Sequence, residues 1–239
     1  MNKTVIIIPS HLDAQRLPRK PLLDISGKPM IVRVWERAIK SKVKDVFVAT
    51  ADQEIVDTIV SNGGNAVLTG KQHTTGSDRI HEAITKLNIE NNIIINVQGD
   101  MPNINPITID LLNDFMISND KADVATVASQ ILDEEILDKN VVKAIVQSNL
   151  KGSNFEKAID FVRETNGEKY IYHHVGLYAY RVSALKKFVE LPKTKNETTR
   201  SLEQMRFLDN GVDVFVGYTD DNPLSVDTKE DLEKIRKII

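Results

Sequence analysis

Residues 93–100 read Ile-Ile-Ile-Asn-Val-Gln-Gly-Asp, and this stretch decides how the chain folds. Its branched apolar run predicts a strand over 93–97 that is buried on both faces of a parallel sheet. The run ends in Gly99 and Asp100, so we expect a carboxylate at the carboxyl edge of the sheet, where ligands bind in open α/β folds. Burying an isolated charge is costly. Asp100 therefore either caps the next helix or binds a hard cation such as Mg²⁺.

Strands and helices alternate around this stretch through the first half of the chain. The apolar patterns predict further strands at 5–8, 46–49 and 66–68, and helices at 29–40, 54–60 and 77–87. Ser77 is the expected N-cap of the last of these helices. The repeated βα order predicts an α/β fold: a Rossmann-like, mostly parallel, twisted sheet with helices on both faces.

The second half of the chain is less regular. Its patterns predict strands at 122–130, 141–147, 170–181 and 212–218, and helices at 201–210, closed by Gly211, and at 228–238, with Thr228 as N-cap. Residues 192–200 are expected to form a loop, and the polar residues 150–167 carry no clear pattern. We therefore expect one domain, 1–239, with a smaller inserted subregion at about 130–200.

Composition narrows the classes of function. The 239 residues are 41% hydrophobic, enough for a sizeable core, and the net charge of −3 shows no basic excess for nucleic acid or an anionic membrane. The absence of cysteine excludes disulfides and thiolate chemistry. The apolar run at 5–8 is too short for a signal peptide or a membrane span. A cytoplasmic protein without nucleic-acid or membrane partners is the expectation.

A basic loop follows the first predicted strand. Residues 9–22 lack the spacing of a Gly-rich dinucleotide loop or a Walker loop, which argues against an NAD-dependent dehydrogenase and a P-loop ATPase. Arg16, Arg19 and Lys20 nevertheless lie at the carboxyl edge of that strand. Facing Asp100, they suit a triphosphate whose charge is shared with Mg²⁺. A solvated basic loop is the competing interpretation, and the spacing alone favours it.

Several motifs, in their order along the chain, resemble one known family. They are IIIPS, RLPRKPLLDISGKPMI, TGSDRI, NVQGDMP, HHVGLYAYR, SLEQMRFLDNG and SVDTKEDLEKI. Over nearly the whole chain they resemble the bacterial CMP-Kdo synthetases, the 3-deoxy-manno-octulosonate cytidylyltransferases. The first motifs indicate only a sugar nucleotidyltransferase. The combination of VQGD, HVGLYAYR, SLEQMR and VDTKEDLE is much more specific.

The resemblance implies a fold, a reaction and partners. The fold would be that of the nucleotide-diphospho-sugar transferases. The reaction would be a Mg²⁺-dependent transfer of the cytidylyl group of CTP to the sugar acid 3-deoxy-manno-octulosonate (Kdo), which releases pyrophosphate and serves lipopolysaccharide synthesis. A cytoplasmic homodimer is implied as well. No general base can be named from the sequence.

The resemblance also implies roles for individual residues. Arg16 and Lys20 match positions that grip the triphosphate, and Asp100 and Asp227 match the Mg²⁺ ligands. Positions in the nucleotide-binding region are matched by Ser10, His11, Gly76, Arg79 and Gln98, and positions that hold the sugar acid by His174, Tyr178, Glu203 and Gln204. From the residues alone, Asp100 and Asp227 each lie beside a strand end or a helix start, so both can reach one edge of the sheet.

Several of these residues have ordinary alternative roles. Asp227 precedes a helix start and could be a capping acid. His174 could be a satisfied core histidine. Glu203 could form a surface ion pair with Arg206 at i+3. Of Tyr178 and the tyrosine two residues on, one is expected to face the core.

The chain departs from the family pattern at several positions. His11 stands where Arg is usual, Arg19 where Gly is frequent, Met101 where Glu is common and Ser225 where Gly is common. We expect the positive charge of Arg19 to replace the one that is missing at position 11. Residues 155–158 align only loosely with a family segment that carries Ser-Arg on the sugar side. Alternatives therefore stay open: a CMP-sugar synthetase for another acid, 8-amino-Kdo or sialic-type, or a non-catalytic nucleotide-binding protein.

Overall fold

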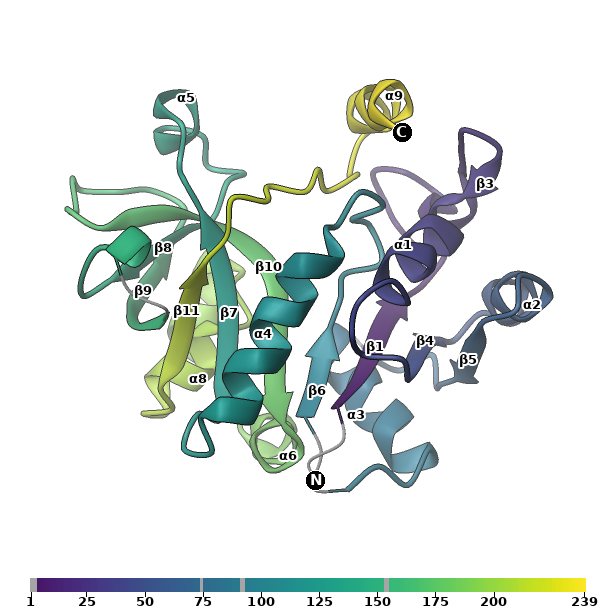
Figure 1. Ribbon diagram of the computed structural model, residues 1–239, viewed down its shortest axis with the longest axis horizontal. Coiled ribbons are helices and arrows are strands. Elements are labelled where there is room, and N and C mark those ends of the chain that lie inside the picture. Colours follow the sequence, from purple (N-terminus) through teal and green to yellow (C-terminus); the bar gives the residue numbers. More distant parts are fainter. Residues whose placement is uncertain (1–3, 74, 91–92, 153–154) are drawn as a thin grey trace.

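The computed structural model describes residues 4–73, 75–90, 93–152 and 155–239. One mixed sheet runs through it, with strands in the order β5-β4-β1-β6-β10-β7-β11-β9-β8 (Figure 1). These strands are β1 (Thr4–Ser10), β4 (Val46–Thr50), β5 (Asn65–Leu68), β6 (Ile93–Asn96), β7 (Val124–Ser129), β8 (Lys143–Val146), β9 (Phe155–Val162), β10 (Ile171–Arg181) and β11 (Val214–Tyr218). A separate hairpin pairs β2 (Asp24–Ile25) with β3 (Lys28–Pro29).

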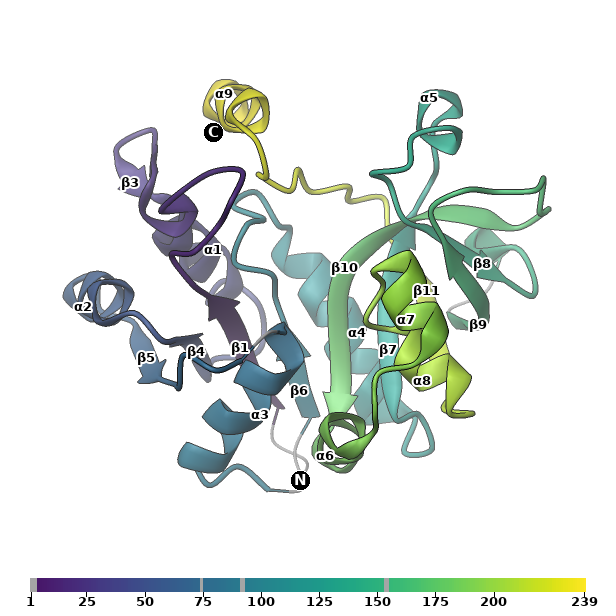
Figure 2. The same ribbon diagram turned by 180° about the vertical axis from the view of Figure 1, so that it is seen from behind.

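Helices cover both faces of the sheet. They are α1 (Met30–Ala38), α2 (Gln53–Ser61), α3 (Gly76–Lys86), α4 (Pro106–Ser118), α5 (Asp133–Ile136), α6 (Val182–Glu190), α7 (Lys195–Arg200), α8 (Met205–Asp209) and α9 (Lys229–Ile238), with short turns η1 (Lys20–Leu22) and η2 (Leu150–Gly152). α1 and α4 lie on one face (Figure 1), and α3, α6, α7 and α8 lie on the other (Figure 2). None of the described helices is long and apolar enough to cross a membrane.

The predicted strand at 93–97 is confirmed, and so is its burial on both faces. β6 pairs in parallel with β1, and Ile93, Ile94 and Ile95 are fully buried. Ile93 and Ile95 belong to the core beneath α1 and α4, whereas Ile94 belongs to the core on the α3 side. Successive side chains of a strand point to opposite faces, so a strand covered on both sides must be apolar throughout.

The strand directions differ from the expectation of a mostly parallel sheet. β5, β4, β1 and β6 are parallel neighbours, as are β7 and β11. The long strand β10 lies between β6 and β7 and runs antiparallel to both, and β8 and β9 also form antiparallel pairs. An apolar run predicts a strand but carries no direction, because direction is set by the connection before it. The sheet is therefore mixed.

Two predictions in the second half are wrong. Residues 195–200 of the expected loop 192–200 form α7, because Thr194 and Glu197 make a capping box around the first turn. The helix expected over 201–210 begins only at Met205. Ser201 has a left-handed backbone with φ of 53°, so α7 stops there and residues 201–204 turn.

Of the two N-cap residues predicted from the sequence, one is wrong and one is confirmed. Thr75, not Ser77, caps α3, since its hydroxyl accepts the N–H of Asp78. Thr228 caps α9 as predicted. The sequence patterns do not predict α4 or α6. In α4 the apolar side chains are spread around the helix instead of forming one stripe, so the usual amphipathic signal is weak.

The close approach of Gly99 to β1 generates a prediction. A Cβ at Gly99 would lie 2.8 Å from the backbone oxygen of Pro9, whereas a Cβ at Gly76 would lie 3.5 Å from a Pro9 side-chain carbon. Gly99→Ala should therefore destabilise the protein by about 1–3 kcal/mol through overpacking. Urea unfolding measures this change, with Gly76→Ala as the matched control. Equal effects of the two substitutions would contradict the prediction.

Candidate active site

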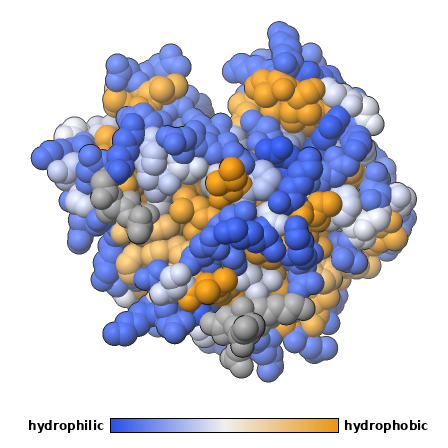
Figure 3. Space-filling model, in the orientation of Figure 1, coloured by the Kyte–Doolittle hydropathy of each residue, from blue (hydrophilic) through white to orange (hydrophobic). Residues whose placement is uncertain are grey.

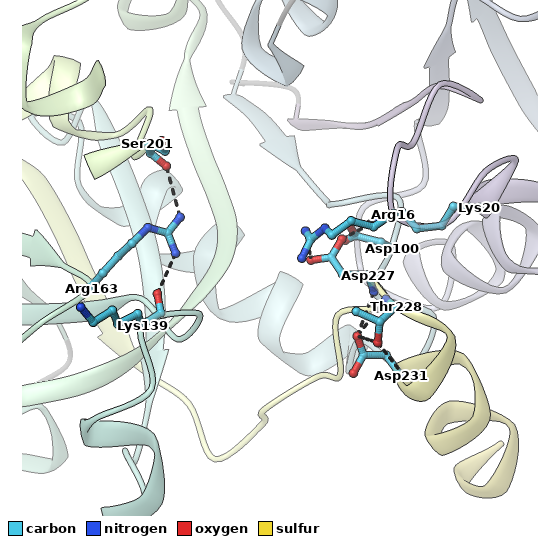
Figure 4. A network of polar contacts seen from close by, with 9 residues as sticks. All are labelled: Arg16, Lys20, Asp100, Lys139, Arg163, Ser201, Asp227, Thr228 and Asp231. Atoms are coloured by element: carbon cyan, nitrogen blue, oxygen red, sulfur yellow. Dashed lines mark hydrogen bonds and ion pairs between the residues drawn. The ribbon is translucent and has the colours of Figure 1, made fainter. Parts of the chain in front are cut away.

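Two carboxylates from distant parts of the chain meet one ammonium group. Lys20 Nζ lies 2.8 Å from Asp100 Oδ2 and 3.0 Å from Asp227 Oδ1, and Arg16 Nη2 lies 3.1 Å from Asp227 Oδ2 (Figure 4). Burial lowers the pKa of Lys20, but the charges of both aspartates and their hydrogen bonds outweigh burial and raise the pKa overall. Lys20 therefore stays charged. The structure brings together all four residues expected at the phosphates and the metal.

A strap between β11 and α9 positions Asp227. The N–H of Val226 donates to the Asp100 carbonyl at 2.9 Å, and the N–H of Leu224 donates to Asn103 Oδ1 at 3.0 Å. The strap is thus fastened to the loop after β6. At its end, Thr228 and Asp231 cap α9, so the Asp227 carboxylate is not the cap and is directed toward Lys20 and Arg16 (Figure 4).

The donor set of this cluster fits a hard cation. Two carboxylates that reach a common ammonium could also reach a common Mg²⁺, which takes one or two carboxylates and fills its remaining positions with water and substrate phosphates. Within the described ranges, no three His, Cys, Asp or Glu side chains gather around one point. The arrangement therefore matches a metal that arrives with a phosphate ligand rather than one held in an all-protein cage.

A cavity of about 420 Å³ opens beside this cluster. It is lined by six of the seven residues expected at the nucleotide, namely Ser10, His11, Lys20, Gly76, Arg79 and Gln98, and by the expected metal ligand Asp100, whereas Arg16 is not among the lining residues. Ser10 is buried, and its hydroxyl has no partner among the described residues, so a ligand could use it. Arg79 is also buried and donates from Nη1 to Thr69 Oγ1 at 2.6 Å. The volume is in the range of small-molecule sites.

Arg19 does not take part in this cavity wall. Its guanidinium pairs with Glu54 of α2, and it is not among the lining residues. Nothing in the structure therefore supports its expected compensation for His11. Arg19 has a left-handed backbone with φ of 58°, which is the conformation that favours glycine.

Met101, where the family pattern has Glu, is buried in the core beneath α1 and α4.

A second cavity of about 380 Å³ adjoins the first. Its lining includes the four residues expected to hold the sugar acid: His174, Tyr178, Glu203 and Gln204. Gln98 lines both cavities. Asn96, which lies opposite Tyr178 on the neighbouring strand, also lines the second cavity, so residues at and just beyond the end of β6 border both spaces. A donor in one cavity and an acceptor in the other would meet at Gln98.

The rings on β10 are buried around this second cavity. His174 Nε2 lies 3.0 Å from Thr126 Oγ1, and burial, aided by the charge of His173, lowers the pKa of His174 to about 3. Its imidazole is therefore neutral, both packed in the core and open to the cavity. Tyr178 and Tyr180 stack with ring centroids 5.7 Å apart, and both are buried. The expectation that only one of them faces the core is wrong, because residues i and i+2 share a face.

Glu203 is a buried carboxyl group in the wall of the second cavity. Its Oε1 has no hydrogen-bond partner among the described residues. Burial raises the pKa of Glu203, against the opposing effect of hydrogen bonds with Ser77 and Thr75 and of the Arg206 charge. The expected surface ion pair with Arg206 is wrong, since Arg206 is buried and binds Glu197. Glu203 therefore keeps one carboxyl oxygen that a ligand in the cavity could use.

Arg163 is the residue of this cavity that sequence reasoning missed. It follows β9, and its guanidinium donates to the backbone oxygen of Arg200 at 2.9 Å. It also donates to the backbone oxygens of Lys139 at 3.0 Å and Ser201 at 3.4 Å (Figure 4). Across the described part of the chain, no carboxylate forms an ion pair with it. The loose alignment at 155–158 pointed to the start of β9, where the residues pair with β11 and do not line the cavity.

The raised pKa of Glu203 generates a prediction. A carboxyl whose pKa is higher in the folded than in the unfolded protein binds more protons when folded, so its contribution to stability is lost as pH rises through the folded pKa. Glu203→Gln, which cannot ionise, should match wild-type stability below pH 4.5 and exceed it at pH 7.5. Urea unfolding at both values measures this, with Glu134→Gln, an exposed acid, as control. A gain that is the same at both pH values would contradict the prediction.

Comparisons with known proteins agree with this geometry. The family described as "Cytidylyltransferase" matches residues 5–214. A 3-deoxy-manno-octulosonate cytidylyltransferase of Nitrobacter winogradskyi is 44% identical, covering 100% of this chain and 94% of the relative, and one of Rhodopseudomonas palustris is 43% identical, covering 99% and 98%.

Solved structures extend the similarity to the fold. A CMP:2-keto-3-deoxy-manno-octonic acid synthetase complexed with CTP superposes with a TM-score of 0.91 at 37% identity, covering 99% of this chain and 98% of the other. A putative glucose-1-phosphate thymidylyltransferase of Bacillus anthracis, 16% identical with a TM-score of 0.69 over 98% and 94% of the two chains, shares the fold alone. The chain therefore has the α/β fold of the nucleotidyltransferases. It belongs to the cytidylyltransferase family, among the 3-deoxy-manno-octulosonate cytidylyltransferases.

Proposed function

We propose that this protein transfers the cytidylyl group of CTP to 3-deoxy-manno-octulosonate, giving CMP-Kdo and pyrophosphate. The single observation that carries the proposal is the pair of cavities that share Gln98. One cavity ends at a cluster of cations and carboxylates suited to a triphosphate. The other is lined by a buried carboxyl, a neutral imidazole and an arginine without an acidic partner, a set suited to an acidic, hydroxyl-rich acceptor.

The phosphate end of the proposal rests on four charged residues. Asp100 and Asp227 would hold Mg²⁺, which would neutralise phosphate charge and orient the triphosphate. Arg16 and Lys20 would bind the phosphates that leave as pyrophosphate. The charges of these four side chains cancel, so the cluster gains little from a metal alone and most from a metal together with a polyanion.

The acceptor end rests on Arg163. Its guanidinium is held by three backbone carbonyls, which fix the planar group without neutralising its charge. A carboxylate that entered the cavity would be the first anion to pair with it, and guanidinium–carboxylate pairs are strong and directional. His174 and Glu203 would then bind acceptor hydroxyls.

The chemical step follows from the adjacency of the cavities. The anomeric hydroxyl of the acceptor would attack the α-phosphorus from the side of Gln98, and pyrophosphate would depart toward Arg16 and Lys20. No covalent enzyme intermediate is required. Positioning of the two substrates and stabilisation of the developing charge would carry most of the rate.

The proposal includes the organisation of the protein. We place the reaction in the cytoplasm, with residues 1–239 acting as one domain and the subregion near 130–200 as its acceptor side. A homodimer is part of the proposal. Leu132 and Leu137, which flank α5, and Ile159 on β9 are exposed, and apolar surface appears over the lobe that carries α5 (Figure 3). Covering such side chains with a second copy would remove apolar area from water.

Removing Asp100 tests the reaction. Asp100→Ala should lower kcat/KM for Kdo-dependent pyrophosphate release by at least about 100-fold, because the triphosphate loses charge stabilisation at its reacting end. The measurement is pyrophosphate release with Mg²⁺ and CTP, UTP or ATP against Kdo, 8-amino-Kdo and a sialic acid. Asp114→Ala, which removes an exposed carboxylate on α4, is the control. Full activity of Asp100→Ala would remove the metal assignment, and tight CTP binding without turnover of any acid would favour a non-catalytic protein.

Removing the charge of Arg163 tests the acceptor. Arg163→Gln should raise KM for Kdo by about 10- to 100-fold, the loss expected for a hydrogen bond to a charged group, and leave KM for CTP unchanged. Steady-state kinetics with each substrate varied measures both constants. Lys157→Gln, on the same strand with its amine paired to exposed Asp213, is the matched control. An unchanged KM for Kdo would contradict this role.

A further inference from the structure

A helical hairpin carries one wall of the second cavity. α7 and α8 are joined by the turn Ser201–Gln204, here called the acceptor turn. The turn contributes the side chains of Glu203 and Gln204 to the cavity, and the oxygens of Arg200 and Ser201 hold the Arg163 guanidinium. The position of this turn therefore sets the positions of several polar groups in the wall.

A buried ion pair joins the two helices of the hairpin. Arg206 Nε donates to Glu197 Oε2 at 2.8 Å, and Arg206 Nη2 donates to Glu197 Oε1, so the contact is bidentate. The two residues are 3% and 5% exposed. Arg206 also donates to the carbonyl of Phe188 at 3.2 Å and lies 4.1 Å above its ring, which attaches the hairpin to α6. Glu197 in turn accepts the N–H of Thr194 at the start of α7.

The ion pair also keeps Arg206 from pairing with Glu203. Arg206 is three residues beyond Glu203, which lies in the acceptor turn before α8, and its guanidinium is occupied by Glu197. Glu203 Oε1 consequently keeps no partner among the described residues. Buried ion pairs contribute little net stability compared with apolar side chains of similar volume. Their benefit lies in a fixed geometry, and here that geometry is the wall of a binding site.

We propose that the Glu197–Arg206 pair is a positioning element of the acceptor site: it holds the acceptor turn in place and keeps Arg206 away from Glu203. This inference rests on the proposed function, because the acceptor is taken to be a sugar acid. Neither residue lines the cavity, so both act through Glu203, Gln204 and Arg163.

The decisive variant is Glu197→Gln, which keeps the shape of the side chain and removes its charge. KM for Kdo should rise by about 10- to 100-fold, the range expected when binding groups are misplaced by an ångström. KM for CTP should stay within about twofold, since the nucleotide cavity contains no part of the hairpin. Glu197→Asp, which retains the charge, should recover part of the loss. The control is Asp213→Asn, which breaks the exposed Lys157–Asp213 pair.

Hydrogen exchange provides a readout that does not depend on turnover. In folded Glu197→Gln, amides of the acceptor turn should exchange faster than in the wild type, while those of β1 and β6 stay unchanged. Unchanged exchange in the turn, or an equal rise of both KM values, would overturn the inference. If Glu197→Gln does not fold, the milder variants Glu197→Asp and Arg206→Lys replace it. For them too, KM for Kdo and exchange in the acceptor turn should rise while KM for CTP stays unchanged. A wild-type protein that turns over no sugar acid would reject the proposed function, whereas exchange in the turn would still decide the role of the pair.

Discussion

The contact of Lys20 with both Asp100 and Asp227 is the interaction on which the rest of the site depends. Carboxylates beside a buried sheet edge are costly unless they are paired, and one ammonium at about hydrogen-bond distance from both satisfies this requirement. The contact links the loop after β1, the end of β6 and the strap before α9. Residues separated by about 200 positions are thereby brought to one edge of the sheet, and Arg16 balances their charge.

The mixed sheet places the two cavities in different halves of the molecule. Parallel strands in the first half direct their carboxyl ends, and the loops that follow, toward the nucleotide cavity. β10 then enters between β6 and β7 and carries His174 and Tyr178 next to the end of β6. Among the described residues, Gln98 alone borders both cavities, and it lies just beyond β6, the strand that β10 joins. The topology therefore places the two cavities on either side of one residue.

The half of the molecule that carries the second cavity adds buried polar groups to its apolar core. Among the described residues, Glu203 carries an unpartnered oxygen, the Arg163 guanidinium is bound only by backbone carbonyls, and Glu197 and Arg206 neutralise each other inside the hairpin. Each of these arrangements costs stability relative to an apolar core. Residues kept at such a cost are typical of binding sites, where a preorganised polar wall matters more than stability.

The sequence by itself determined the parts that local pattern controls. The apolar runs predicted β6 and its neighbours, the Thr228 cap predicted the start of α9, and the ordered motifs identified the family and nearly all of the candidate site. The tertiary structure alone decided the direction of β10, the partner of Arg206 and the place of Arg163 in the cavity wall. These features depend on contacts between residues that are distant in the chain or on opposite sides of a turn. Such contacts form only when the elements pack, so no local periodicity records them.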